Sequence, residues 1–159
     1  LASLAACRTS EVLEMTWGEV DMEAQLWTIP AARMKGGVQH RVPLTEEMLR
    51  ILEAVKPLAS TYVFEGQKRH RPLSNMSMLM LLRRMGRGQY TVHGFRSTFR
   101  DWAAEEAGAP REVAEAALAH QFGSDVERAY ARSDLLERRR ALMVDWCGRM
   151  GAARRGSQR

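Results

Sequence analysis

The chain has 159 residues, 45% of them hydrophobic, which is enough for one globular domain with a core and too few to favour two. A run of 18 or more apolar residues and a signal-peptide pattern are both missing, which argues against a membrane or secreted protein, and two cysteines without metal-ligand spacing argue against a disulfide framework. A net charge of +5 is compatible with an anionic partner, and we expect a soluble, intracellular protein.

The first 44 residues predict a helix followed by a small sheet. Apolar side chains among small and polar ones, without a proline, predict one helix from Leu1 to Met15 that carries Arg8 and Glu11 on one side. Three short segments rich in β-branched and aromatic residues follow, at 20–22, 25–30 and 38–44. The glycines at 36 and 37 accept the positive φ angles of a tight turn, so we expect an antiparallel three-stranded sheet with Lys35 at or beside a hairpin tip.

The rest of the chain predicts helices. Thr45 is the expected N-cap of a helix that Pro57 ends, and a Met- and Leu-rich run extends from Ser74 to Met85. We interpret the methionines of this run and the four tryptophans as core residues. Further helices are expected at 92–107, 110–120, 126–132 and 134–150. The fold class is therefore mainly α with a small antiparallel three-stranded β-sheet.

The predicted domain covers residues 1–150, and the Gly-, Arg- and Ser-rich tail at 151–159 is expected to be disordered. Because the first residue is Leu1 rather than Met, and the chain opens directly in a helical pattern, we expect the natural protein to have further sequence upstream.

Positive charge is concentrated between residues 66 and 100. This stretch holds eight of the 24 Lys and Arg residues and no Asp or Glu, as a surface that binds a phosphate backbone would. A solvated basic face is the alternative interpretation of the same charges. The eight residues are Lys68, Arg69, Arg71, Arg83, Arg84, Arg87, Arg96 and Arg100.

Six residues of chemically active types occur in a suggestive order. Taken singly, each has an ordinary structural explanation, such as a surface charge or a helix-packing aromatic. Together they are more specific, because they occur in short stretches with defined neighbours: Cys7-Arg8-Thr9-Ser10-Glu11, Arg33-Met34-Lys35, His40-Arg41-Val42-Pro43-Leu44, Thr91-Val92-His93-Gly94-Phe95-Arg96, Leu118-Ala119-His120 and Ala129-Tyr130.

This ordered set resembles the tyrosine recombinases, and among them the integrases of P4-like prophages, over nearly the whole chain. The resemblance implies the catalytic core of the DNA breaking-rejoining enzymes. It implies that Arg8 and Arg96 bind phosphate, that Lys35 is the hairpin lysine, and that Tyr130 is the nucleophile, with His93 and His120 as the two active-site histidines. The family often has glycine two residues before the first arginine, where this chain has Ala6, an exchange expected to be mild within a helix.

The residue types fit phosphodiester exchange. Two guanidiniums match phosphate oxygens and stabilise the charge that builds up in the transition state. Glu11, three residues after Arg8, is placed to orient that guanidinium. A free tyrosine has a pKa near 10, so only on the order of one molecule in a thousand is phenolate at neutral pH without help.

We therefore hypothesise a division of proton transfers. His93 or a water accepts the phenol proton, His120 hydrogen-bonds a phosphate oxygen, and Lys35 protonates the leaving 5′ oxygen. A covalent 3′-phosphotyrosine keeps the phosphodiester energy, so the sequence predicts a reaction without ATP, and the constellation contains no carboxylate cluster for Mg²⁺. We expect no cofactor and no metal site, since the four histidines lack metal-ligand spacing.

The resemblance implies double-stranded DNA attachment sites as substrate and a homotetramer on two duplexes, with accessory DNA-bending or directionality proteins as possible partners and no membrane. It also implies the bacterial cytoplasm and the nucleoid. Two alternatives stay open: a non-catalytic DNA-binding module derived from an integrase, and a type IB topoisomerase-like enzyme. Candidate DNA-binding residues outside the six are Lys68, Arg69, Arg71, Arg83 and Arg84.

Overall fold

The computed structural model describes residues 1–56, 61–120 and 135–156 of the chain. They are mainly helical with one small sheet, which confirms the predicted fold class. No helix in these ranges is long and apolar enough to cross a membrane. In chain order the elements are α1 (Ala2–Ala5), α2 (Thr9–Leu13), η1 (Trp17–Glu19), β1 (Val20–Asp21), β2 (Leu26–Ile29), η2 (Ala31–Arg33), β3 (His40–Pro43), α3 (Glu46–Val55), α4 (Ser77–Arg84), α5 (Val92–Glu105), α6 (Arg111–Ala117) and α8 (Leu136–Gly156).

The three strands form an antiparallel sheet in the order β1-β2-β3, as the sequence predicted. Trp27 on β2 lies opposite Val42 on β3, and both side chains are buried, so the inner face of the sheet belongs to the core. The β2–β3 connection turns at Gly37, whose φ of 65° favours glycine and whose N–H donates to the carbonyl of Met34 at 2.9 Å. Lys35 lies in this turn.

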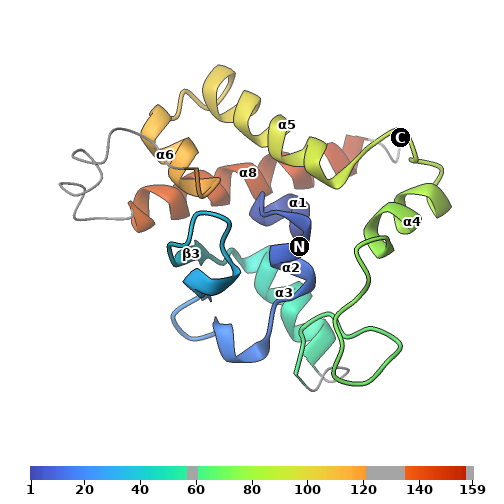
Figure 1. The fold of residues 1–159 in the computed structure, drawn as a ribbon. Helices are drawn as coiled ribbons and strands as arrows, with labels where there is room; N and C mark the ends of the chain where they lie inside the picture. The colour runs from blue at the N-terminus through green and yellow to red at the C-terminus, as the bar shows by residue number, and fades with distance from the viewer. Residues whose placement is uncertain (57–60, 121–134, 157–159) are drawn as a thin grey trace.

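The core joins the elements that carry the two predicted phosphate-binding arginines. In Figure 1, α5 and α6 lie on one side of α8, while α1 and the sheet lie on the other. Phe99 of α5 meets Trp146 of α8 edge to face, with ring centroids 5.4 Å apart. The indole N–H of Trp146 then donates to the carbonyl of Ser3 in α1 at 2.9 Å. The N-terminal segment and α5 are thereby fixed relative to each other.

The single helix predicted for residues 1–15 is wrong, because two short helices meet there at an elbow. Ala6 ends α1 with a left-handed φ of 49°, and Arg8 is extended (φ −70°, ψ 151°) before α2 begins. Ala5, Ala6 and Cys7 are all buried in the core, so tertiary packing at the elbow outweighs the helix propensity of the alanines.

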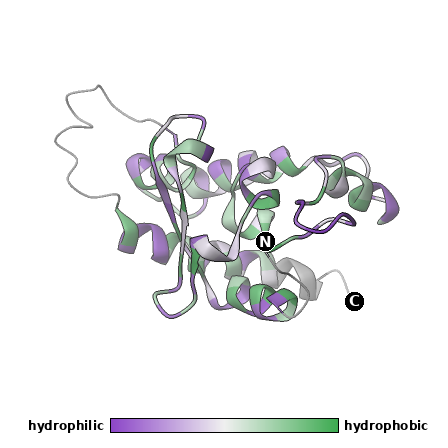
Figure 2. Cartoon of the chain, turned by 60° about the horizontal axis from the view of Figure 1, so that its bottom comes forward, coloured by the Kyte–Doolittle hydropathy of each residue, from purple (hydrophilic) through white to green (hydrophobic). Residues whose placement is uncertain are grey.

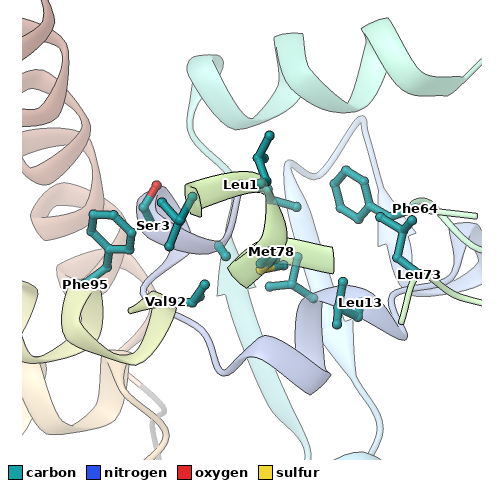
Figure 3. A pocket seen from close by; sticks show the side chains of 12 residues that line it. Leu1, Ser3, Leu13, Phe64, Leu73, Met78, Val92 and Phe95 are labelled. Carbon is teal, nitrogen blue, oxygen red and sulfur yellow. The ribbon is translucent and has the colours of Figure 1, made fainter. Parts of the chain in front are cut away.

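The prediction that the methionines between Ser74 and Met85 are core residues is also wrong for much of α4. No residue of α4 is buried, and Met76, Met80 and Met85 at and around it are about half exposed. The opposite face of α4 borders an apolar pocket of about 290 Å³, in which Met78 lies near residues from four other segments (Figure 3). The labelled lining residues are Leu1, Ser3, Leu13, Phe64, Leu73, Met78, Val92 and Phe95.

Three of the four tryptophans predicted to be core residues, Trp27, Trp102 and Trp146, are buried, whereas Trp17 is partly buried and packs against the core. The C-terminal helix is longer than predicted: α8 continues to Gly156, past the expected tail boundary at 151, because the alanines and arginines at 152–155 are good helix formers. The helix expected at 126–132 and the end of the tail lie outside the described residues, so the boundaries of the domain stay a prediction.

Candidate active site

Arg8 is held by Glu11 at the start of α2. The backbone N–H of Arg8 donates to one carboxylate oxygen of Glu11 at 2.8 Å, and its Nη1 donates to the other at 2.7 Å. Glu11 is only 3% exposed, whereas the Arg8 side chain is 29% exposed. The contact predicted from the spacing is present, although Arg8 caps the helix rather than lying inside it. One buried carboxylate therefore caps α2 and orients a guanidinium that still reaches solvent.

Arg96 on α5 is buried and binds the ends of two other helices. Its Nη1 donates to the carbonyl of Ala6 at 2.6 Å, and its Nη2 donates to the carbonyl of Leu118 at 2.7 Å. These two residues are the C-caps of α1 and α6, where helix carbonyls lack intrahelical partners and carry partial negative charge. Within the described ranges, no carboxylate pairs with Arg96. The guanidinium is stabilised by dipoles and keeps its full charge for an anion.

The two arginines also affect each other electrostatically. Burial, and then the positive charge of Arg8, lower the pKa of Arg96 from its ordinary value. Guanidiniums stay charged in proteins, so this shift describes mutual repulsion and incomplete solvation rather than neutralisation. A phosphate placed between Arg8 and Arg96 would relieve both, which makes the position favourable for an anion.

The first turn of α5 brings His93 to the pocket that Arg8 and Arg96 line. Thr91 caps this helix by accepting a hydrogen bond from the N–H of Gly94 at 3.0 Å. His93 is exposed and lies three residues before Arg96, on the same face of the helix. An open pocket of about 400 Å³ collects these groups, and its lining residues are Cys7, Arg8, Thr9, Ser10, Asn75, His93 and Arg96.

His120 contacts Arg96 but is not among the residues that line this pocket. The chain leaves α6 in a Schellman turn, in which Ala119 has a φ of 50° and the N–H of His120 donates to the carbonyl of Glu115 at 3.0 Å. The ring then bridges two groups: Nε2 is 3.2 Å from Nη2 of Arg96, and Nδ1 is 2.6 Å from a carboxylate oxygen of Glu115. Four of the six predicted residues, Arg8, His93, Arg96 and His120, therefore form one connected group.

The other two predicted residues are not placed in the pocket. Lys35 is exposed in the β2–β3 turn and does not line it. The base of that turn is nonetheless tied to the site, because Arg33 donates to the backbone carbonyl of Glu11 at 2.6 Å and pairs with Glu19. Tyr130 lies outside the described residues.

The predicted DNA-binding residues lie on the exposed surface around α4. Lys68, Arg69 and Arg71 belong to the loop before this helix, which Figure 2 shows as a hydrophilic segment. Arg83 and Arg84 are in its last turn. All five are exposed, and none lines the pocket.

Sequence reasoning missed Asn75 and Glu115, and it named Arg100 only as part of the basic stretch at 66–100. Asn75 lines the pocket from the segment that precedes α4, and nothing in its local sequence indicates this. Glu115 contacts His120 and also Arg100, whose Nη2 is 3.2 Å away. The spacing of five residues between Glu115 and His120 is not a helix-face spacing, so only the left-handed turn at Ala119 explains their contact.

Comparison with known proteins shows the family of the chain. The model of the phage integrase family matches residues 1–137 of the chain. The chain belongs to the phage integrase family. It is a catalytic domain of the tyrosine recombinase type, so the resemblance seen in the sequence is confirmed.

Curated relatives of this integrase-family chain come from bacteria and their phages. A prophage integrase of Escherichia coli (strain K12) is 42% identical over 158 residues, which cover 97% of this chain and 38% of that protein. The integrase of Shigella phage Sf6 is 32% identical over 146 residues, covering 89% of this chain and 38% of that protein. The integrase of Enterobacteria phage P4 is 29% identical over 165 residues, covering 92% and 38%. The chain thus spans well under half the length of these relatives.

Solved structures support the integrase fold. An integrase from mycobacterium phage Brujita superposes with a TM-score of 0.66 at 21% identity, covering 90% of this chain and 48% of that one. The crystal structure of XerA recombinase gives a TM-score of 0.62 at 16% identity, covering 82% and 52%. At these identities the likeness establishes the fold alone.

Proposed function

We propose that this chain catalyses site-specific DNA recombination, in prophage integration and excision, through a covalent 3′-phosphotyrosine at Tyr130. The observation that carries this proposal is the pair Arg8 and Arg96, which border one pocket with His93, while Arg96 is held by two helix-end carbonyls and His120 and has no carboxylate partner among the described residues. Arg96 is the stronger of the two for this purpose, because an arginine paired with a carboxylate, as Arg8 is with Glu11, gains less from a phosphate. Family membership supports the reaction class.

The reaction is a transesterification. The Tyr130 oxygen forms a bond to the phosphorus, the bond from phosphorus to the 5′ oxygen breaks, and the DNA is left with a 3′-phosphotyrosine and a free 5′ hydroxyl. Arg8 and Arg96 bind the two non-bridging oxygens and stabilise the extra charge of the pentacoordinate transition state. His93 or a water takes the phenol proton, and Lys35 gives a proton to the 5′ oxygen. Attack by a second 5′ hydroxyl reverses these steps and joins the strands without ATP.

The first test is for the covalent intermediate. The chain and its Tyr130→Phe variant are each mixed with strand-interrupted DNA carrying a candidate core site, in EDTA, and examined for a denaturant-resistant, protease-sensitive adduct. We expect an adduct with the parent and none with the variant. Because the relatives are longer, the assay is repeated with the complete reading frame that encodes this chain. DNA binding without an adduct there would instead indicate a non-catalytic DNA-binding module.

A second test addresses Lys35. Replacing the leaving 5′ oxygen with sulfur removes the need for a general acid, because a thiolate is a good leaving group. The Lys35→Ala variant is expected to cleave ordinary DNA more slowly than the parent does. It should cleave the sulfur-containing DNA at close to the parental rate. Equal loss on both substrates would contradict the role of Lys35 as the acid.

The proposed partners are double-stranded DNA attachment sites and three further copies of the chain, in a tetramer on two duplexes within the bacterial cytoplasm. Accessory DNA-bending or directionality proteins belong to the same proposal. Exchange between two matched sites is the expected outcome in a plasmid assay. Relaxation of supercoiled plasmid without site preference would instead favour a topoisomerase-like activity.

A further inference from the structure

Glu115 lies at the centre of a chain of charged groups that leads from Arg100 to Arg96, and Arg96 lines the pocket. Its carboxylate is 10% exposed and contacts His120 Nδ1 at 2.6 Å through one oxygen and Arg100 Nη2 at 3.2 Å through the other. His120 then reaches Arg96 Nη2 at 3.2 Å through its other ring nitrogen. Arg96 and Arg100 both come from α5, so Glu115 and His120 of the α6 end fit between two arginines of one neighbouring helix.

The donors and acceptors in this chain assign the proton on His120. Arg96 only donates, so Nε2 of His120 accepts and carries no proton while that contact is made. The ring proton is therefore on Nδ1, where the Glu115 carboxylate accepts it. The opposite tautomer would place two donors face to face at one nitrogen and two acceptors at the other. The carboxylate thus fixes the tautomer of His120 through Nδ1.

A bound phosphate changes what Nε2 must do. To hydrogen-bond a phosphate oxygen, Nε2 has to carry a proton, which it takes up from solvent water as the anion enters, so the ring becomes an imidazolium. A carboxylate already hydrogen-bonded to Nδ1 stabilises that cation without moving. Among the described residues, the other charged groups that contact this pair are Arg96 and Arg100, both positive, so the negative charge of Glu115 offsets their effect on the ring.

We propose that Glu115 is a positioning residue for the reaction, acting through His120 to fix its tautomer in the DNA-free site and to stabilise its charged form on phosphate. This inference rests on the proposed function for its catalytic consequence. Its structural part, the tautomer of His120, is independent of that function.

The test compares Glu115→Gln with Glu112→Gln. The amide in Glu115→Gln keeps the size of the side chain but loses the charge, and its single oxygen cannot serve both Arg100 and His120. Glu112 lies on the same helix, and its only described ion pair is an exposed one to Arg138 at 3.5 Å, so it is a matched control. Three quantities are measured: ring ¹⁵N chemical shifts of His120, DNA affinity, and the rate of adduct formation at Tyr130.

We expect Glu115→Gln to slow adduct formation by roughly 10- to 100-fold while DNA affinity changes by less than about threefold. The His120 ring signals, assigned by their loss in His120→Gln, should move from Nδ1–H towards a mixture of tautomers. The Glu112→Gln variant should match the parent in all three measurements.

Other results have defined meanings. A parental adduct rate in Glu115→Gln would overturn the positioning role. If parent and variants all form no adduct, the proposed function fails, and the His120 spectrum then decides the inference: an Nε2–H tautomer in the unsubstituted chain overturns it, and an Nδ1–H tautomer that Glu115→Gln disturbs supports it. The spectrum of the unsubstituted chain also decides the matter if Glu115→Gln does not fold.

Discussion

Arg96 donates a hydrogen bond of 2.6 Å to the carbonyl oxygen of Ala6, a residue ninety positions earlier in the chain. The same guanidinium donates at 2.7 Å to Leu118, so one side chain joins the ends of α1 and α6. Its position is therefore fixed by the fold on both sides of α5. This arrangement links the stability of the domain to the geometry of a group that we propose binds phosphate.

Arg96→Lys is expected to lower both the stability of the domain and the rate of adduct formation. A lysine cannot present a planar fork to two carbonyls, so at least one of the buried oxygens of Ala6 and Leu118 loses its donor. We expect the free energy of unfolding to fall by about 1–3 kcal/mol and adduct formation by at least about 100-fold. Urea denaturation and the adduct assay measure these effects. Arg50→Lys, at an exposed helical ion pair, is the control and should change neither.

Glu11→Gln separates the orientation of Arg8 from its presence. The amide has only one oxygen for the two Arg8 donors that the carboxylate serves, so Arg8 becomes less well ordered. Adduct formation should fall by roughly 10- to 100-fold, with a loss of stability of about 1–2 kcal/mol. Glu14→Gln, one residue after α2 and half exposed, is the matched control. Equal rates for the two variants would show that Arg8 needs no partner.

Ala119→Gly should stabilise the domain. Ala119 has a φ of 50°, a conformation that costs an alanine about 1 kcal/mol more than a glycine. Thermal or urea denaturation should therefore give a gain of up to about 1 kcal/mol, with the His120 position unchanged. Ala116→Gly, inside the same helix, should have the opposite sign, a loss of about 1 kcal/mol. A loss at both positions would contradict the left-handed turn.

Ionisation of Cys7 is expected to lower the free energy of unfolding at alkaline pH. Burial, followed by the charge of Glu11, raises the pKa of its thiol to about 12 in the folded chain, against an ordinary value of 9.0. The folded state therefore holds the proton more tightly, so its stabilising effect is complete below pH 9 and is lost as the pH rises from about 9 to 12. At pH 10 the loss is about 1.4 kcal/mol relative to pH 8.

Urea denaturation at pH 8 and pH 10 measures this loss. Cys7→Ala should lack the Cys7 contribution while keeping those of other groups, including Cys147, whose pKa burial also raises. The same pH dependence in both proteins would be evidence against the burial of an un-ionised Cys7. In the native chain at pH 8, both thiols should resist alkylation, because only thiolates react.

The basic loop gives a prediction for the salt dependence of DNA binding. Lys68, Arg69 and Arg71 are exposed and, among the described residues, form no ion pairs. Replacing all three with Gln should weaken binding by roughly tenfold or more and reduce the slope of log K against log salt by up to about 2.7. A triple Gln variant of Arg50, Arg138 and Arg149, which are paired with carboxylates, has the same charge change. If both triples lower the slope equally, the loop is not a specific DNA contact.

The sequence predicted the fold class and the three-stranded sheet correctly, because these depend on local patterns. The sheet follows from β-branched segments, and Gly37 marks its turn through a conformation that glycine favours. The grouping of Arg8, His93, Arg96 and His120 was expected only through their order in the chain and the family resemblance. Their contacts, by contrast, depend on packing between segments that are far apart in the sequence.

The errors have physical causes of the same kind. Ala6 is a good helix former, yet it ends α1 because burial and Arg96 determine its conformation. The Met-rich run has helical periodicity, but no pattern states whether the core covers both sides of the helix, and α4 leaves one side exposed. Glu115 was missed because Ala119, which brings His120 back towards it, carries no sequence signal for a left-handed turn.

The two carbonyl partners of Arg96 also bear on the order of events during synthesis. Of the three residues Ala6 leaves the ribosome first, Leu118 is made 112 residues later, and the arginine itself lies between them. A nascent chain that has passed Arg96 but not Leu118 has only one of the two acceptors, so its guanidinium is not yet fixed next to Arg8. Because domains fold as units, we expect the phosphate-binding group to assemble only once α6 is complete. Under the proposed function, an incomplete chain would therefore carry its exposed basic loop before it has an assembled site for cutting DNA.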